Sequence, residues 1–267
     1  MVTDRKYRRW PQVTFGLRDH EKSGIRSTTG LVRLRTWALT SLFFALSIAS
    51  PTRAELDHQG GGWLIAGGSG SLEAVSPKLS RLRWWLDFQA RFFENTNGLG
   101  QTIVRPALGW SLTESTSVWL GYAWIRDFPA NRSTIDENRI WQQFLWNGAV
   151  GQWSLQSRTR LEQRFVQTGS DVGWRLRQFV KILYPLLASD RLRFAAYDEV
   201  FIALNSTDWG ADAGFDQNRL FLGFNVAVDS AGRIQAEFGY LNRYASRPAL
   251  LPGQMDHLGV VSLMLSY

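Results

Sequence analysis

Apolar and polar residues alternate at a period of two through residues 152–165 of this 267-residue chain. One set includes Trp153, Leu155, Leu161 and Phe165, and the other includes Arg158, Arg160, Glu162 and Arg164. Successive side chains of a β-strand point to opposite faces of a sheet. The pattern therefore predicts a strand with one mostly apolar face and one strongly charged face.

Similar segments recur downstream, each close to the roughly ten residues that cross a membrane in a β-barrel. We expect strands at residues 82–93, 101–112, 117–126, 138–150, 152–166, 174–186, 191–204, 216–228, 233–244 and 257–267. In such a barrel the apolar faces meet lipid and the polar faces line a lumen. The pattern predicts an all-β fold over residues 55–267, a transmembrane antiparallel up-and-down β-barrel of about 10–12 strands.

A glycine-rich segment at residues 62–72 would make an odd eleventh strand. Bacterial single-chain barrels have even strand counts. We therefore expect this segment to be a lumen plug or a partial strand, or the barrel to have a twelfth strand.

The breaks between the expected strands alternate between short and long, as turns and loops at the two ends of an outer-membrane barrel do. With the C-terminus on the periplasmic side, the longer breaks all fall on the outer side. The last strand has Val261, Leu263, Leu265 and Tyr267 on one face. Such an ending is similar to the signal that barrel-assembly machinery reads, so we expect this machinery to bind the strand that ends at Tyr267.

The N-terminal region has the pattern of a secretory leader. Arg33 and Arg35 precede an apolar run at residues 37–49, and small residues follow it. The run is shorter than the about 20 residues needed for a transmembrane helix. We expect residues 1–54 to comprise an extension and a signal peptide, with true initiation near residues 31–32 and cleavage after Ala54 or slightly earlier. Leader and barrel together predict the bacterial outer membrane.

The net charge of +7 lies in the leader, because residues 1–54 hold ten basic and three acidic residues and the remainder holds twenty of each. We therefore expect no nucleic-acid partner. The chain has no cysteine, no metal-ligand spacing and no phosphate loop, so we expect no cofactor. Its 13 Trp, 16 Phe and 7 Tyr suit aromatic girdles at membrane interfaces. The alternative is the aromatic-rich core of a soluble protein.

Charged residues of the expected strands fall opposite the apolar ones. Because a lipid-facing Arg or Lys costs about 2–4 kcal/mol at the membrane midplane, we expect these side chains to line the lumen. The expected set is Arg139, Arg158, Arg160, Glu162, Arg164, Arg175, Arg177, Lys181, Arg191, Arg193, Glu199, Arg219, Arg233 and Glu237. Asp198 falls on the apolar face, so we expect it near a strand end.

Two uses of this lumen remain open. The side chains can pair across strands and fill a narrow barrel as a structural network. Alternatively, the surplus of basic residues can provide a path for a small anionic solute.

Two histidines follow the leader, His58 and His257. We expect His58 to precede the barrel and to be disordered, and His257 to lie at the outer rim. A lipid-modifying hydrolase at the outer leaflet that depends on His257 is an alternative function. However, the chain has no Gly-x-Ser-x-Gly nucleophile motif. We therefore expect a non-enzymatic barrel in contact with outer-membrane lipid.

Several motifs resemble those of one known family. Residues 137–143 resemble a Glu-His-Arg-x-Trp-Gln-Gln motif, and residues 158–164 resemble an Arg-x-Arg-Leu-Glu-Gln-Arg motif. Residues 197–201, 215–219 and 239–242 follow in the order of that family. The chain thus resembles domain of unknown function 2490 over roughly residues 63–267. Asn138 stands where the family often has His. The resemblance implies a predicted bacterial outer-membrane β-barrel and implies no activity.

Overall fold

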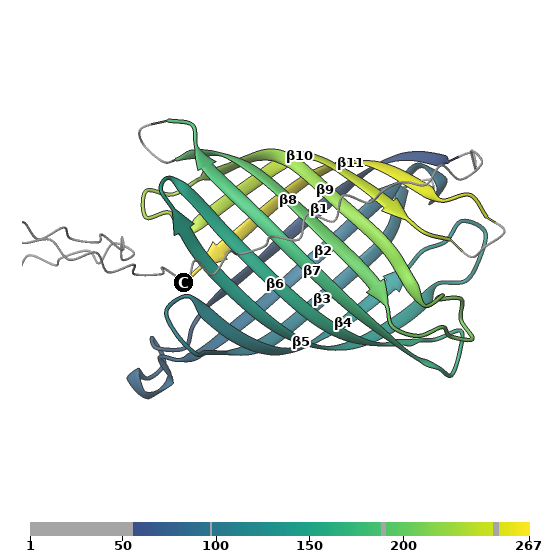
Figure 1. Cartoon of the computed structure of the whole chain (residues 1–267), viewed down its shortest axis with the longest axis horizontal. Helices are drawn as coiled ribbons and strands as arrows, with labels where there is room; N and C mark the ends of the chain where they lie inside the picture. Colours follow the sequence, from purple (N-terminus) through teal and green to yellow (C-terminus); the bar gives the residue numbers. More distant parts are fainter. Residues whose placement is uncertain (1–55, 97, 188–190, 248–250) are drawn as a thin grey trace, which may run out of the picture. The chain divides into compact units, whose positions relative to one another are not determined.

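In the computed structural model, residues 56–267 are described, except for 97, 188–190 and 248–250. The expected leader therefore lies outside the described residues. Eleven strands of the described chain form one closed barrel (Figure 1). They are β1 Asp57–Ser71, β2 Leu82–Phe93, β3 Gly98–Ser111, β4 Thr116–Asp127, β5 Ile135–Val150, β6 Trp153–Val166, β7 Val172–Pro185, β8 Leu192–Ala203, β9 Gly214–Ala227, β10 Ile234–Ala245 and β11 Gln254–Ser266.

Short helices occur in two connections. They are the 3-10 helices η1, Pro77–Leu79, and η2, Glu94–Thr96. Over the described ranges, no helix is long and apolar enough to cross a membrane. The expected all-β closed barrel is confirmed.

Consecutive strands pair antiparallel around the barrel, and β1 closes it by pairing parallel with β11. The segment at residues 62–72 is therefore part of a full wall strand. The expectations of a lumen plug, a partial strand or a twelfth strand are wrong, because a parallel closing pair accommodates an odd count. Glycines conceal the alternation in β1, and they allow close approach to β2. A Cβ added at Gly61 would lie 2.2 Å from the backbone oxygen of Phe92.

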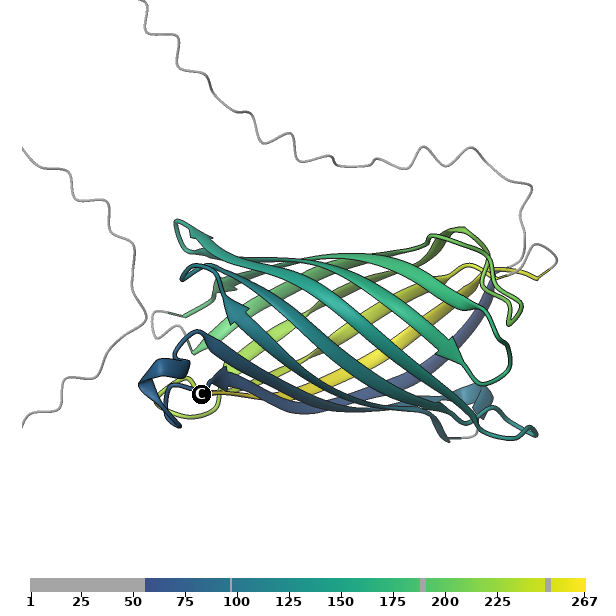
Figure 2. The same cartoon turned by 90° about the horizontal axis from the view of Figure 1, so that it is seen from below.

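The parallel pair puts the start of β1 and the end of β11 at opposite ends of the barrel. We call the end that holds Tyr267 the C-terminal end and the other the loop end (Figure 2). The connections at 112–115 and 151–152 lie at the C-terminal end and are shorter than those at 128–134 and 204–213 at the loop end. Other connections depart from this rhythm. The connection at 72–81 is long and lies at the C-terminal end, and those at 94–97 and 167–171 at the loop end are shorter than those at 186–191 and 228–233 at the C-terminal end.

The outer face of the wall is largely apolar. Phe88, Leu120 and Leu222 are each about half exposed on strands β2, β4 and β9. The interior holds two buried apolar clusters, one around Trp119 and Trp141 and one around Trp63, Phe221 and Leu258. The same interior also holds buried charged residues. Alternation along each strand produces both faces at once.

Asp198 is exposed on the outer face near the middle of β8, where it pairs in register with Leu220 of β9. The expectation that it lies near a strand end is therefore wrong. Its carboxylate accepts a hydrogen bond from Asn218 Nδ2 at 2.9 Å, so a polar pair sits within an otherwise apolar surface.

Candidate functional site: the polar interior of the barrel

Most of the charged residues expected in the lumen lie on the inner face of the wall. They are Arg139 in β5, Arg158, Arg160, Glu162 and Arg164 in β6, Arg175, Arg177 and Lys181 in β7, Arg193 and Glu199 in β8, Arg219 in β9 and Glu237 in β10. Arg191 and Arg233 instead lie exposed in turns at the C-terminal end. Strands β8 and β10 each begin one residue later than expected, which leaves these two arginines outside them.

Glu162 is the most heavily bridged carboxylate of the interior. Its side chain is 1% exposed and accepts hydrogen bonds from Arg175 Nη2 at 2.6 Å and from Arg177 Nη1 at 2.5 Å. Arg160 Nη1 and Arg139 Nη1 lie 3.7 and 3.8 Å from its oxygens. One carboxylate therefore holds four guanidinium groups together, which offsets part of the cost of burying them.

Glu199 is a second bridging carboxylate, on β8. It accepts hydrogen bonds from Arg158 Nη2 and Arg177 Nη2, both at 2.6 Å, and Arg219 Nη1 lies 3.5 Å away. Arg177 thus joins Glu162 to Glu199. We call Glu162, Glu199 and the arginines that bridge to them the central network. It extends from β5 and β6 to β9.

Aromatic rings pack against the arginines of the central network. Phe201 is fully buried, and the guanidinium carbons of Arg177 and Arg219 lie 4.4 and 4.5 Å from its ring centroid. Arg160 lies 4.1 Å from the centroid of Trp141. Arg160 also donates two hydrogen bonds to Gln143 Oε1, at 3.0 and 2.6 Å. Cation–π contacts are strongest when desolvated, so these rings favour buried charge.

The sequence pattern missed several interior carboxylates. Glu137 accepts hydrogen bonds from Arg139 Nε and Arg164 Nε, both at 2.6 Å. The expected strand begins at residue 138 and excludes Glu137, whereas β5 begins at Ile135 and Glu137 shares a face with Arg139. Asp216 accepts from Arg175 at 2.9 Å, and Asp87 accepts from Arg105 at 2.9 Å. These groups add Arg164 and Arg105 to the basic residues that Glu162, Glu199 and Glu237 pair.

Arg91 is buried, and within the described chain its side-chain hydrogen bonds go to amide oxygens. It donates to Gln101 Oε1 at 2.6 Å and to Gln89 Oε1 at 3.2 Å. Its guanidinium carbon lies 3.9 Å from the ring centroid of Trp63, and that of Arg219 lies 5.1 Å from the same ring. Two cations therefore meet at one indole in the interior.

Two loops are pinned together at the loop end. Asp208 accepts hydrogen bonds from the backbone N–H of Ser170 at 2.8 Å and of Asp171 at 3.1 Å. These backbone donors hold the pKa of the Asp208 carboxyl below its usual range. Trp209 donates to the backbone oxygen of Asp171, and Arg164 lies 4.8 Å from its ring centroid. The loop pair therefore reaches the outermost arginine of β6.

His58 lies within β1, so the expectation that it precedes the barrel is wrong. Its Nδ1 lies 3.0 Å from His257 Nε2, and His257 Nδ1 lies 2.6 Å from Tyr240 Oη. These contacts bring no serine or threonine hydroxyl to His257. Among the described residues, no group of three or more His, Cys, Asp or Glu side chains could hold a metal ion.

Comparison with known proteins places the chain in a family. A protein from Methylorubrum extorquens, described as uncharacterized, is 34% identical over 188 residues, which cover 69% of this chain and 80% of that protein. No solved structure matches. The profile of the family described as protein of unknown function (DUF2490) matches residues 60–250. The chain therefore belongs to the DUF2490 family.

Proposed function

We propose that this protein is an integral β-barrel of the bacterial outer membrane, with a closed interior and a structural, non-enzymatic role. The apolar outer face supports this placement, because a surface of that extent on a soluble protein would be an aggregation hazard. Aromatic side chains near both ends of the wall add support, with Trp153 against Tyr184 at one end and Phe215 against Tyr244 at the other. The leader pattern supports export.

The burial of the central network carries the proposal of a closed lumen. Arg160 and Glu162 are each 1% exposed, although they lie within β6 and face the interior. Charges that line an open aqueous pore would stay hydrated and exposed. Further along the barrel, Lys181 of β7 bridges to Glu237 of β10 across the interior. The network thus occupies the space that a solute would need.

A narrow path for small anions is a second candidate, favoured by Arg91. A buried cation whose hydrogen bonds go only to amides lacks a counter-charge, and an anion would supply it. Anion preference follows where basic groups line a constriction. This candidate needs the central network to open at least transiently.

Planar-bilayer recording of the refolded protein separates the two candidates. A closed barrel predicts no discrete openings from the wild type. It predicts openings from the double variant Glu162→Ala/Arg177→Ala, which removes the middle of the central network. Anion-selective openings from the wild type would establish the anion path and contradict the closed lumen. A wild type that stays soluble without detergent would contradict the membrane placement itself.

The proposed partners are outer-membrane lipid and the barrel-assembly machinery. The alternating face of β11 that ends at Tyr267 supports the second, since Val261, Leu263 and Tyr267 are all about half exposed or more. Deletion of Tyr267 should lower the amount of heat-modifiable, folded protein in the outer membrane of expressing cells. An unchanged amount would remove Tyr267 from that role.

A further inference from the structure

Polar residues occupy the outer face at the middle of four consecutive strands. Gln142 is the eighth of sixteen residues in β5, Thr159 and Gln178 are the seventh of fourteen in β6 and β7, and Asp198 is the seventh of twelve in β8. All four side chains are exposed. We call them the outer polar stripe. The strands are neighbours in the barrel wall, so the stripe is continuous.

The other strands carry apolar or aromatic residues at the corresponding outward positions. These are Leu64 in β1, Phe88 in β2, Val104 in β3, Tyr122 in β4, Leu220 in β9, Tyr240 in β10 and Val261 in β11. At the middle of the strands, polar outward residues therefore occur on β5, β6, β7 and β8 and not on the other seven strands of the barrel.

Hydrogen bonds within the wall satisfy the stripe only in part. Gln142 and Gln163 exchange two hydrogen bonds, at 3.1 and 3.0 Å, and Thr159 Oγ1 donates to Gln178 Oε1 at 2.6 Å. Gln178 Nε2 in turn donates to Ser157 Oγ at 3.1 Å and to the backbone oxygen of Phe179 at 3.3 Å, so its donors are satisfied within the wall. Asp198 accepts one hydrogen bond, from Asn218. A carboxyl group can accept more than one hydrogen bond, and the Gln142 amide has a second N–H beyond the one that bonds Gln163. Acyl chains offer no partner for these groups, and unpaired polar groups in hydrocarbon are costly.

We propose that the outer polar stripe is the contact surface for a second copy of this chain, related by a two-fold axis parallel to the barrel axis. This inference rests on the proposed membrane location. Rotation about such an axis preserves depth, so the stripe of one copy meets the stripe of the other. It also reverses the order of strands, so Gln142 faces the partner's Asp198 and Thr159 faces the partner's Gln178. The remaining amide donor of Gln142 then meets the acceptor oxygens of the partner's Asp198.

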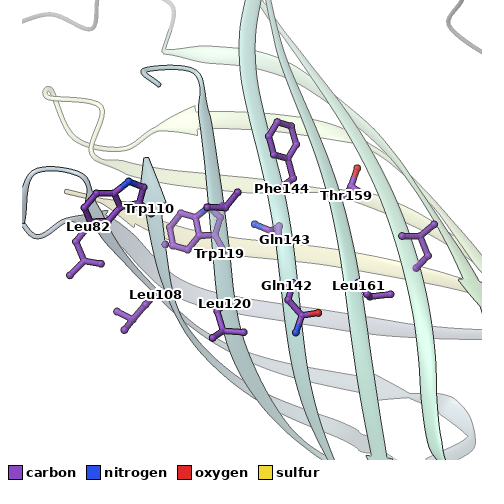
Figure 3. Close-up of a pocket in the computed structure, with 13 residues that line it drawn as sticks. Leu82, Leu108, Trp110, Trp119, Leu120, Gln142, Gln143, Phe144, Thr159 and Leu161 are labelled. Carbon is purple, nitrogen blue, oxygen red and sulfur yellow. The ribbon is translucent and has the colours of Figure 1, made fainter. Parts of the chain in front are cut away.

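An apolar groove lies next to the outer polar stripe on the same face of the wall. It has a volume of about 670 Å³, and its apolar lining includes Leu108, Leu120 and Leu161 (Figure 3). Gln142 and Thr159 line the groove as well as belonging to the stripe. The copy that packs on the stripe would thus also cover this hollow. Close packing and hydrogen bonds are the forces that associate membrane-spanning segments.

Size-exclusion chromatography with light scattering in detergent tests the proposal. The wild type should elute as a dimer. Gln142→Leu should raise the dimer dissociation constant about tenfold, because the two-fold axis repeats the change and removes both hydrogen bonds between Gln142 and the partner's Asp198. Asn242→Leu is the matched control, since it also replaces an outward polar residue but lies on β10, and its mass should equal that of the wild type. Replacement of an outward polar residue by leucine favours the membrane-inserted fold, so misfolding does not confound the comparison.

Disulfide cross-linking tests the symmetry, because the chain has no cysteine of its own. A mixture of Gln142→Cys and Asp198→Cys proteins should cross-link on oxidation, whereas each variant alone should not. Cross-linking of either variant alone would overturn the two-fold arrangement. A wild type that is monomeric in detergent would overturn the proposed interface. That result would not contradict the membrane location. Solubility without detergent would overturn the membrane location.

Discussion

Trp141 of β5 lies directly over Gly121, its register partner on β4. A Cβ added at Gly121 would lie 2.1 Å from Cζ2 of the indole, and Trp141 is 1% exposed. The glycine thus makes room for the ring on which Arg160 stacks. A larger residue at position 121 would force the Trp141 ring, and Arg160 stacked on it, to shift.

Gly121→Ala should therefore destabilise the barrel by about 1–3 kcal/mol, the usual cost of overpacking a core. Equilibrium unfolding in urea with protein in lipid vesicles measures this change. Gly259→Ala is the control, because a Cβ there meets nothing within 4 Å. Equal midpoints for the two variants would contradict the steric role of Gly121.

Glu162→Gln should be one of the most damaging single changes in the interior. It keeps the side-chain volume but removes the charge that holds Arg175 and Arg177, so buried guanidinium groups lose their counter-charge. Breaking a buried pair in this way costs about 3–5 kcal/mol. The same unfolding assay measures it.

Arg233→Gln serves as the comparison for Glu162→Gln. Arg233 is 60% exposed and pairs with Asp229 at 3.4 Å in a turn. Exposed pairs contribute about 0–1 kcal/mol, so this variant should unfold close to the wild type. A Glu162→Gln barrel as stable as Arg233→Gln would show that the central network is not a stabilising element.

The contact between the two pinned loops should weaken in acid. Backbone N–H donors hold the pKa of Asp208 below its usual range, so folding favours the ionised carboxylate. Its contribution is present above the ordinary aspartate pKa of about 3.9. It is lost as the pH falls below that value and through the lowered pKa of the folded state.

Hydrogen exchange at the Ser170 and Asp171 amides measures this pH dependence. After correction for intrinsic rates, protection should fall in the wild type below about pH 4. In Asp208→Asn, protection should be low at every pH and should not change in that range. Protection that is independent of pH in the wild type would show that the Asp208 carboxylate does not hold the two loops together.

Tags at the two ends of the barrel wall should report opposite sides of the membrane. The start of β1 lies at the loop end and Tyr267 lies at the C-terminal end. With a periplasmic C-terminus, an epitope placed just before Leu56, downstream of the expected cleavage site, should bind antibody on intact cells. An epitope after Tyr267 should bind only after permeabilisation. Both epitopes accessible on the same side would contradict the parallel closing pair.

Alternation predicted where strands occur and which residues face inward, most clearly in β6. There the expected segment of 152–166 compares with Trp153–Val166 in the structure. The signal failed where side chains were missing or exceptional. The glycines of β1 have no side chain, so they show no alternation and the pattern does not predict a full strand there. The pattern also predicts Asp198 near a strand end, because its hydrogen bond with Asn218 joins two strands and cannot be inferred from one.

Partners across the interior could not be predicted, because they depend on how the wall curves and closes. Arg158 and Glu199 are 41 residues apart and on strands that are not neighbours. Lys181 and Glu237 are 56 residues apart. Alternation at a period of two assigns each of these residues to the inner face. It does not indicate which residue of another strand lies opposite. Single-residue errors at strand starts also matter, as Arg191, Arg233 and Glu137 show.

The parallel pair of β1 and β11 also constrains how such a wall can have arisen. Duplication or loss of a hairpin changes the number of strands by two and keeps its parity. From an even-stranded ancestor, hairpin events alone cannot produce the eleven strands described here. One strand must have been gained or lost singly. Glycine-rich β1, which joins its neighbour β11 without a hairpin, is the natural candidate for that single addition.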